Sequence, residues 1–294
     1  KRPETVLDVF EKVKFLDICI LQETHYKHVS DTLYFNSIFE SNFNVFHSLA
    51  KSRCTGMCII FSNKIIVDRS MQIFEIPGRC LAFRIPIDDN YIILCGLYCP
   101  AQKNLREPFF HNVMENMDRS IYVSDVIMAG DFNFVELPFL DRYPGTGRKL
   151  LTEPGLAKFS EIKYSLSLED PFRHFNPTQK MYTFRSTRKS LSRIDRFYIS
   201  LNLLENFRTS DCRIIPGFQH RLLISRFRLG KNDANFGPSY WKMNILLLNS
   251  EHLKHTLVGL INTFLSNSAN LGGENFIISY EMLKIQISEA SKIF

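Results

Sequence analysis

The sequence has few cysteines and no long apolar run. None of its apolar runs approaches the roughly 20 residues of a membrane helix, and its first residues, Lys1-Arg2-Pro3-Glu4, lack the apolar core of a signal peptide. We therefore expect a soluble, intracellular protein with no membrane partner. The cysteines number seven, an odd count, and most lie in strand-like runs, which favours buried thiols over disulfides or zinc ligands. They are Cys19, Cys54, Cys58, Cys80, Cys95, Cys99 and Cys212.

Low-complexity segments are also absent, and 45% of the 294 residues are hydrophobic, enough for a large core. Past residue 229 the chain turns polar and then amphipathic. We expect a main domain, 1–229, and a helical C-terminal extension, 230–294, that packs on the main domain, on a missing domain or on a partner protein. Apolar periodicity predicts helices at 5–14 and about 105–119. Strand-like composition predicts strands at 56–61, 81–87, 91–98, 126–130, 194–199 and 222–229.

Gly130-Asp131-Phe132-Asn133 follows one of these apolar strands directly. Side chains two apart on an extended backbone point the same way, so Asp131 and Asn133 would meet at one strand end. Buried polar groups need hydrogen bonds or a ligand. The segment therefore indicates either a functional site or a simple Asx-type turn.

Two further segments repeat this design. Residues 17–25 form an apolar run that ends at Glu23, and residues 192–200 carry Asp195 among strand-forming residues, one hairpin after Thr183. Carboxylates from several strands that converge at one sheet edge are what a hard cation needs. For Asp195 the alternative is a local ion pair with Arg193 or Arg196.

Together these segments resemble the endonuclease/exonuclease/phosphatase family, most closely the endonuclease domain of LINE-type non-LTR retrotransposon proteins. The resemblance spans about residues 4–229. It implies an α/β fold, a four-layer sandwich of two mixed sheets flanked by helices, with the active site at one edge. Residues 237–242 are similar to the connector that leads to a reverse transcriptase in complete elements. The motifs, in the family's order, are Leu21-Gln22-Glu23-Thr24-His25, Leu97-Tyr98-Cys99-Pro100, Gly130-Asp131-Phe132-Asn133, Leu140-Asp141-Arg142, Tyr182-Thr183-Phe184 and Ser192-Arg193-Ile194-Asp195.

The resemblance also implies a reaction, the metal-dependent cleavage of a phosphodiester bond by water. Glu23 would hold the cofactor, Mg²⁺ or Mn²⁺. Asp131 would orient or deprotonate the water, and Asn133 would hydrogen-bond the phosphate. Tyr98 and Thr183 would steady the leaving group and the neighbouring phosphate.

The sequence departs from its relatives around His220. The resemblance gives this residue a hydrogen bond to the scissile phosphate when it is protonated, and gives Asp195 the task of holding the site together from behind. Relatives carry Ser-Asp-His, whereas Phe218 and Gln219 precede the histidine here. A carboxylate would fix the imidazole tautomer and stabilise its charge. A comparable loss in a serine protease costs on the order of 10⁴ in turnover, so we expect impaired activity.

A second departure concerns the N-terminal end. The family begins with a strand that carries an asparagine for the metal site, before the helix expected at residues 5–14. Only four residues precede that helix. We therefore expect this first strand to be absent from the chain. Gly96, where relatives often carry asparagine, is a lesser change.

Positive charge gathers around one predicted hairpin. The formal net charge is +6 and the pI about 8.9, which favours a polyanionic partner. In the family the corresponding hairpin enters a DNA groove, so the resemblance makes its cations DNA contacts. The alternative is a solvated surface. The cations are Arg185, Arg188, Lys189, Arg193 and Arg196.

Two functions fit these observations. One is a Mg²⁺-dependent endonuclease of retrotransposon origin that nicks DNA in the nucleus, with Gln219 limiting its activity. The other is an inactive, domesticated domain of the same fold that binds nucleic acid or protein. Phe218, Gln219 and the missing asparagine favour the second function, whereas the family resemblance and the retained site residues favour the first.

Overall fold

The computed structural model describes residues 14–52, 55–143, 153–213, 219–229 and 250–268, with a few positions between 279 and 290. The chain divides into two compact units, Lys1–Lys231 and Asn232–Phe294. Four sequence predictions fall outside the described residues: the helix at 5–14 apart from Lys14, the burial of Cys54 and Cys212, the side chain of Phe218, and the connector at 237–242.

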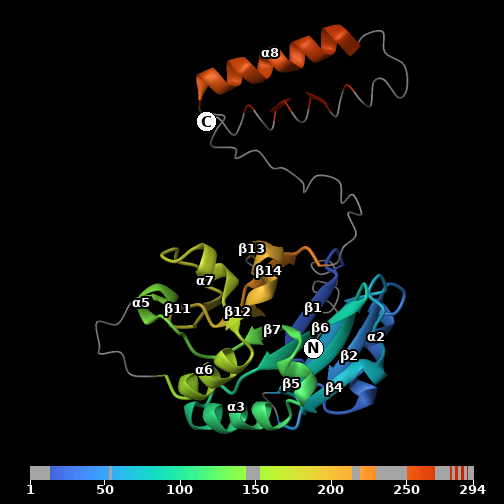
Figure 1. The fold of residues 1–294 in the computed structure, drawn as a ribbon, viewed down its shortest axis with the longest axis vertical. Helices are drawn as coiled ribbons and strands as arrows, with labels where there is room; N and C mark the ends of the chain where they lie inside the picture. The colour runs from blue at the N-terminus through green and yellow to red at the C-terminus, as the bar shows by residue number, and fades with distance from the viewer. Residues whose placement is uncertain are drawn as a thin grey trace. The chain divides into compact units, whose positions relative to one another are not determined.

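Two facing sheets form the centre of the first unit (Figure 1). The larger has the strand order β4-β5-β6-β7-β12-β9 and the smaller the order β1-β3-β2. β6 and β7 run parallel, and the other described pairs in both sheets are antiparallel. The strands are β1 (Ile18–Gln22), β2 (Phe43–Ser48), β3 (Met57–Ser62), β4 (Gln72–Ile76), β5 (Cys80–Ile87), β6 (Asn90–Tyr98), β7 (Asp125–Asp131), β9 (Leu168–Glu169) and β12 (Asp195–Ser200).

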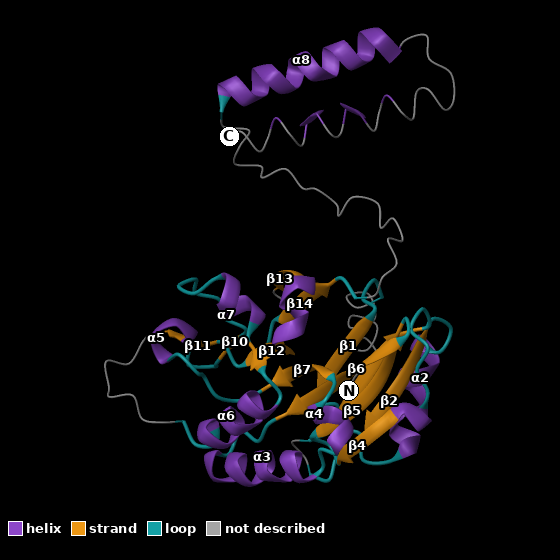
Figure 2. Cartoon of the chain, viewed as in Figure 1, coloured by secondary structure: helices purple, strands orange, loops and turns teal. Residues whose placement is uncertain are grey.

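Three apolar clusters join the layers. The central cluster lies between the two sheets and contains Phe61 and Phe83. A second cluster, around Phe159, packs the other face of the larger sheet against α3 and α6, and a third, around Phe39, packs the smaller sheet against α2. Figure 2 shows these helices outside the strands. The predicted four-layer α/β fold is confirmed. The helices are α2 (Leu33–Phe39), α3 (Arg106–Glu115) and α6 (Leu156–Ser165).

The alternation in β5 follows from this layering. Leu81 and Phe83 point into the central cluster, whereas Cys80 and Ala82 point toward the helices. Successive side chains of a strand face opposite sides, so a strand between two cores must be apolar on both. This is why β5 and β6 read as nearly continuous apolar runs.

Smaller elements lie beside the end of the larger sheet where β7 ends. One small sheet has the order β10-β11-β8, and β13 pairs with β14. The strands are β8 (Arg142–Tyr143), β10 (Phe184–Arg185), β11 (Leu191–Ser192), β13 (Phe207–Arg213) and β14 (Leu222–Phe227). Short helices are η1 (Val29–Thr32), η2 (Arg69–Met71), η3 (Lys103–Leu105), α4 (Arg119–Tyr122), α5 (Pro138–Asp141), α7 (Pro171–Phe175) and η4 (Leu201–Asn206).

The six predicted strands are confirmed as β3, β5, β6, β7, β12 and β14, and the helix predicted at 105–119 is confirmed as α3. In the second unit, α8 (Glu251–Ser268) is amphipathic: Leu253 and Leu257 are buried, whereas Leu265 is exposed. The cysteines at 19, 58, 80, 95 and 99 are buried free thiols, as predicted. Among the described residues, no helix is both long and apolar enough to cross a membrane.

Candidate active site

Strand register places three polar side chains in a row at one sheet edge. Tyr98, the last residue of β6, is the parallel partner of Asp131, the last residue of β7. Asp131 is in turn the antiparallel partner of Asp195, the first residue of β12. Partners in neighbouring strands project from the same face. Residues far apart in the sequence thus meet at the edge that the sequence predicted.

Gly130 explains why a glycine precedes Asp131. Its φ is +148°, and a Cβ at this position would lie 1.9 Å from the carbonyl oxygen of Leu97. Only glycine allows β6 and β7 to approach so closely. The glycine before Asp131 is therefore required by the strand pairing that sets Asp131 beside Tyr98.

Asp131 and Asn133 form an Asx turn as well as part of the site. The backbone N–H of Asn133 donates to Asp131 Oδ1 at 2.8 Å, and Asn133 Nδ2 donates to Asp131 Oδ2 at 3.0 Å and to the carbonyl of Cys99 at 2.8 Å. Asn133 has φ +55°, a conformation that asparagine tolerates. The Asx turn is therefore confirmed, and the functional interpretation of this segment stays a prediction. The amide donors of Asn133 bond the protein, so a phosphate would have to compete for them.

His220 faces both aspartates of the row. Its Nδ1 lies 3.1 Å from each carboxylate oxygen of Asp195, and its Nε2 lies 4.0 Å from Asp131 Oδ2. One ligand atom from each of the three residues fits within 4.8 Å of the others. The alternative partners of Asp195, Arg193 and Arg196, form other contacts, described below. Asp195 thus supplies the carboxylate that orients the imidazole.

The surroundings shift the pKa values of Asp131 and His220 upward. Burial first, and the charge of Asp195 second, raise the pKa of Asp131 to about 8, despite the opposing effect of His220. For His220, burial disfavours the charged ring, but the hydrogen bond and charge of Asp195, with the charges of Asp131 and Glu23, raise its pKa to about 9. The imidazole is therefore protonated at neutral pH.

Glu23 joins the site through Tyr98. The Tyr98 hydroxyl donates to Glu23 Oε1 at 2.6 Å. Burial and this hydrogen bond raise the pKa of Tyr98 well above its usual value, so the hydroxyl remains a donor. Glu23 follows the end of β1 with φ +55°, and its side chain is 49% exposed. The predicted convergence of Glu23, Asp131 and Asp195 is therefore present.

Arg79 is a site neighbour for which the sequence carried no motif. It follows Gly78 in the turn between β4 and β5, and its guanidinium carbon lies 4.6 Å from the centre of the Tyr98 ring. Arg79 Nη1 also donates to the Tyr98 carbonyl at 3.3 Å. The arginine thus holds the tyrosine from its ring side. Only the strand pairing of β5 with β6 brings the two together.

Thr183 was predicted to contact the substrate, but its position in the structure does not allow that contact. It is fully buried, and its hydroxyl accepts the backbone N–H groups of Ile194 at 3.1 Å and Asp195 at 3.0 Å. Its backbone also pairs with Ser192 and Arg221. Thr183 therefore fixes the backbone from which Asp195 projects, and it positions this carboxylate rather than touching DNA.

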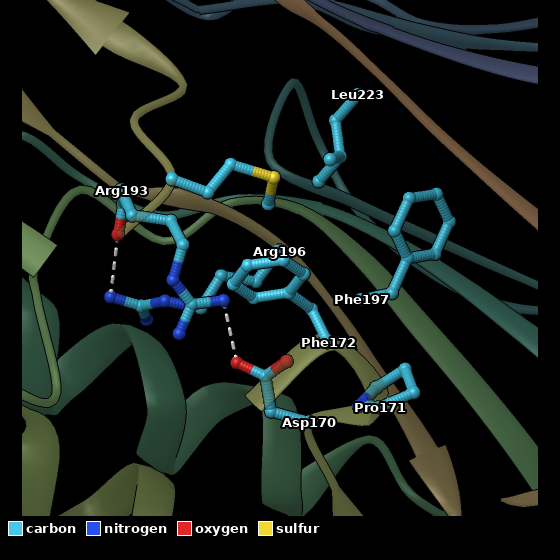
Figure 3. Close-up of a pocket in the computed structure, with 8 residues that line it drawn as sticks. Asp170, Pro171, Phe172, Arg193, Arg196, Phe197 and Leu223 are labelled. Carbon is cyan, nitrogen blue, oxygen red and sulfur yellow. Dashed lines mark hydrogen bonds and ion pairs between the residues drawn. The ribbon is translucent and has the colours of Figure 1, made fainter. Parts of the chain in front are cut away.

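Two of the predicted DNA contacts, Arg193 and Arg196, are buried (Figure 3). Arg193 binds Asp141 at 2.8 Å and Asp170 at 2.7 Å. Arg196 donates to the carbonyls of Phe134 and Arg193. Each is 1% exposed, so neither can bind DNA, and the prediction was wrong for both. Arginines that lie close to a site in the sequence suggest an exposed basic surface, but the sequence does not show whether they are buried against partners within the protein.

Arg193 and Arg196 also line a small crevice between α7, β12 and β14 that has no room for a water molecule (Figure 3). Its walls are mainly apolar, from Phe172, Phe197 and Leu223. Arg193 is paired with Asp141 and Asp170, and Arg196 donates to two backbone carbonyls, so this crevice belongs to the core.

Arg185, Arg188 and Lys189 remain exposed on the β10-β11 hairpin. The turn between the strands is closed by Ser186 and Ser190, whose backbones hydrogen-bond at 2.9 Å. These three cations are thus on the surface, as the predicted DNA contact requires.

Gln219 is exposed, and its carbonyl accepts the backbone N–H of Arg185 at 2.9 Å. This bond and the bridge from Phe184 to His220 attach the histidine segment to β10. The backbone of Gln219 therefore helps to position His220, while its amide side chain faces solvent.

The donor chemistry of the site suits a hard divalent cation. Two carboxylates gather around one imidazole, and a third, Glu23, joins them through Tyr98. Oxygen ligands are what Mg²⁺ and Mn²⁺ prefer. Glu23 keeps an accessible second oxygen, 3.8 Å from His25 Nε2. The His220 ring is engaged with Asp195 and is better suited to a phosphate. The residues therefore fit a divalent metal, with Glu23 as the accessible ligand.

The sequence matches the Endonuclease/Exonuclease/phosphatase family over residues 1–212. This range covers most of the chain and includes Glu23, Tyr98, Asp131 and Asp195. The chain belongs to this family. The predicted resemblance is confirmed.

A relative with a similar sequence is a transposon TX1 protein of Xenopus laevis, an uncharacterized 149 kDa protein, with 27% identity over 251 residues. The match covers 83% of this chain and 18% of the relative, so the chain spans about a fifth of that protein's length. The predicted likeness to retrotransposon proteins is confirmed by this match.

Three solved structures have a similar fold at low identity. The AP endonuclease LMAP from Leishmania major has a TM-score of 0.63 and 18% identity, covering 76% of this chain and 82% of that one. The Xenopus laevis APE2 catalytic domain has a TM-score of 0.59 and 19% identity, and the match covers 80% of this chain and 93% of that one. The 3′ phosphatase NExo from Neisseria, bound to a product DNA hairpin, has a TM-score of 0.60 and 14% identity. That match covers 76% of this chain and 95% of the other. The likeness establishes the shared fold.

Proposed function

We propose that the chain is a Mg²⁺-dependent endonuclease domain of retrotransposon origin that nicks DNA. One observation carries the proposal: Glu23, Tyr98, Asp131, Asp195 and His220 gather at a single sheet edge in a family of nucleases and phosphatases. Relatives named as AP endonucleases, a 3′ phosphatase bound to DNA and a transposon protein support DNA as the substrate. Action on chromosomal DNA would require a nuclear location.

The protonated imidazole is the main phosphate-binding group in this proposal. His220 carries its charge at neutral pH because Asp195 holds Nδ1, which leaves Nε2 to donate to a non-bridging oxygen. Charge that develops on the phosphorus oxygens in the transition state is thereby stabilised. Tyr98, kept protonated beside Glu23, would be a second donor on the same side once its hydroxyl exchanges the hydrogen bond to Glu23 for one to the phosphate.

Asp131 has the position of the general base. It is buried at the centre of the row, 4.0 Å from His220, and its raised pKa brings it toward neutrality, where a base is most effective. Glu23 would hold the metal, which when bound supplies Lewis-acid stabilisation of the phosphate charge. Thr183 and Asn133 keep Asp195 and Asp131 in place.

A second candidate function is an inactive, domesticated domain that binds nucleic acid or protein. The neutral Gln219 beside His220 favours it, because the site lacks one carboxylate of the family pattern. The exposed apolar residues of α8, Val258, Ile261 and Leu265, are candidates for a protein contact. Against it, Asp195 already gives His220 the hydrogen bond that a neighbouring carboxylate would supply.

The test is the conversion of supercoiled plasmid to the nicked form with Mg²⁺, Mn²⁺ or EDTA. We expect nicking with either metal, none in EDTA, and a loss on the order of 10²-fold or more with Glu23→Gln. Glu161→Gln, on the exposed surface of α6, is the matched control and should retain activity. No nicking by the unaltered chain, with DNA binding still measurable, would favour the second function instead.

A further inference from the structure

The small β10-β11-β8 sheet presents one face to solvent. Arg185 pairs with Leu191, and Leu191 pairs with Tyr143. Partners in adjacent strands share a face, so these three side chains form one row across the sheet. Arg185 is exposed, Leu191 is half-buried, and Tyr143 is 56% exposed. A cation, an aliphatic group and an aromatic ring thus stand together on the surface.

The opposite face of this sheet is fixed to the protein. Its row consists of Phe184, Ser192 and Arg142. The Phe184 ring lies 4.7 Å from the His220 ring, and Arg142 binds the buried Glu153 at 3.0 Å. These contacts determine which face is outward. Because Phe184 and Arg185 are adjacent, the exposed row begins one residue from a ring that touches the active-site histidine.

The charge around the row suits a polyanion. Arg188 and Lys189 are exposed in the turn that joins β10 to β11, and residues 184–192 contain no acidic residue. Exposed aromatic rings beside arginine and lysine are the combination by which proteins bind unpaired nucleotides: the ring stacks on a base and the cations hold the phosphates. An arginine guanidinium can also lie over a base.

We propose that Arg185, Leu191 and Tyr143 form a platform on which one unpaired nucleobase of the substrate stacks, on the face of the small sheet turned away from His220. The row crosses three strands and spans about 10 Å. A base within a duplex is stacked on both faces by its neighbours and cannot use the platform without leaving the stack. The platform therefore selects DNA with an unpaired nucleotide near the nick. This inference rests on the proposed function, because it takes nucleic acid as the ligand.

The experiment compares two DNA duplexes in EDTA by fluorescence anisotropy. One is fully paired, and the other has a single unpaired 2-aminopurine, whose fluorescence falls when it stacks. We expect tighter binding of the second duplex, with quenching. Tyr143→Ser should weaken this binding on the order of tenfold and abolish the quenching, with little effect on the paired duplex. Tyr143→Phe should keep both.

Two controls separate stacking from other effects. Tyr164→Ser removes a tyrosine that is 90% exposed on α6, outside the small sheet, and should change neither binding nor quenching. Equal melting temperatures establish that each variant is folded. Tyr143→Ser that preserves the quenching, or that weakens both duplexes equally, overturns the platform.

The two proposals can fail separately, because binding in EDTA does not depend on cleavage. Quenching that is lost with Tyr143→Ser, in a chain that never nicks plasmid, would leave the platform standing and remove the enzymatic function. Metal-dependent nicking together with an absence of quenching in the unaltered chain would do the reverse.

Discussion

Arg193 and Asp195 lie two residues apart at the start of β12 but belong to carboxylate clusters of opposite character. Arg193 binds Asp141 and Asp170, with Arg173 also 2.8 Å from Asp141. Burial works to raise the pKa of Asp141, but the hydrogen bond and charge of Arg193 outweigh it and hold that pKa below its usual value. Asp131, beside Asp195, has its pKa raised to about 8.

The difference teaches how to tell a structural cluster from a functional one in this fold. Around Asp141 the charges are balanced within the chain, so the cluster needs nothing more. Around Asp131, full ionisation would leave more negative charge than one imidazole can neutralise, which raises the pKa of Asp131, and a bound cation would stabilise the ionised form. A carboxylate whose pKa is raised in this way, beside the exposed Glu23, is therefore the stronger indication of function.

The largest effect is expected from breaking the balanced cluster. Arg193→Met leaves the buried Asp141 and Asp170 with one cation fewer and should lower the free energy of unfolding by roughly 3–5 kcal/mol. Arg185→Met, an exposed arginine of the same hairpin, should leave unfolding nearly unchanged and weaken DNA binding instead. Chemical denaturation and DNA titration measure the two. Equal destabilisation by both variants would contradict the comparison.

The unbalanced cluster should respond in the opposite way. Asp131→Asn should reduce nicking by on the order of 10²–10⁴-fold, the range of a general base. The raised folded pKa of Asp131 means that its ionisation opposes folding increasingly from pH 4 to pH 8. The free energy of unfolding of Asp131→Asn at pH 8 should therefore be no lower than that of the unaltered chain. Asp141→Asn is the matched change in the balanced cluster and should clearly destabilise the chain.

The charge of His220 predicts a dependence on pH. Its folded pKa, about 9, lies above its usual 6.5. Its stabilising contribution is therefore fully present below pH 6.5 and is lost as the pH rises through about 9. The difference in melting temperature between the unaltered chain and His220→Gln should narrow over this window, and nicking should decline above pH 9. A melting-temperature difference that stays constant from pH 6 to pH 10 would contradict a raised pKa for His220.

The smallest effect is expected from restoring the family carboxylate. Gln219→Asp should raise nicking several-fold, well short of 10⁴, because Asp195 already holds Nδ1 of His220. The control is Gln219→Glu, whose longer side chain tests whether the position or merely the charge matters. Quantitative plasmid nicking at one Mg²⁺ concentration measures both. A decrease with Gln219→Asp would mean that an added negative charge harms the site.

The sequence predicted the site edge well because strand ends can be recognised locally. Asp131 follows one apolar run and Asp195 begins another strand, and antiparallel strand pairing then brings the two together. The burial and contacts of Arg193 and Thr183 could not be predicted in this way. Both depend on groups brought close by folding: Asp141 lies 52 residues from Arg193, and the Thr183 hydroxyl binds the Asp195 backbone 12 residues away.

The less regular parts of the fold were also harder to foresee. β2 is polar at three of its six positions and β4 at two of its five, and α2 has seven residues, too short for a helical period to stand out. Arg79 joined the site only through the pairing of β5 with β6. Local pattern predicts an element when both of its faces or one long face is apolar.

The register that pairs Asp131 with Asp195 makes the carboxylate cluster a report on how the sheet was assembled. A slip of one residue between β7 and β12 would turn every side chain of the moved strand to the other face, so the two carboxylates would no longer meet. Most of the apolar contacts could survive such an error, because both faces of these strands are buried. A preparation that is folded by spectroscopy could therefore contain molecules in which the two carboxylates are apart. Under the proposed function, the fraction of molecules that binds metal would count the correctly paired ones.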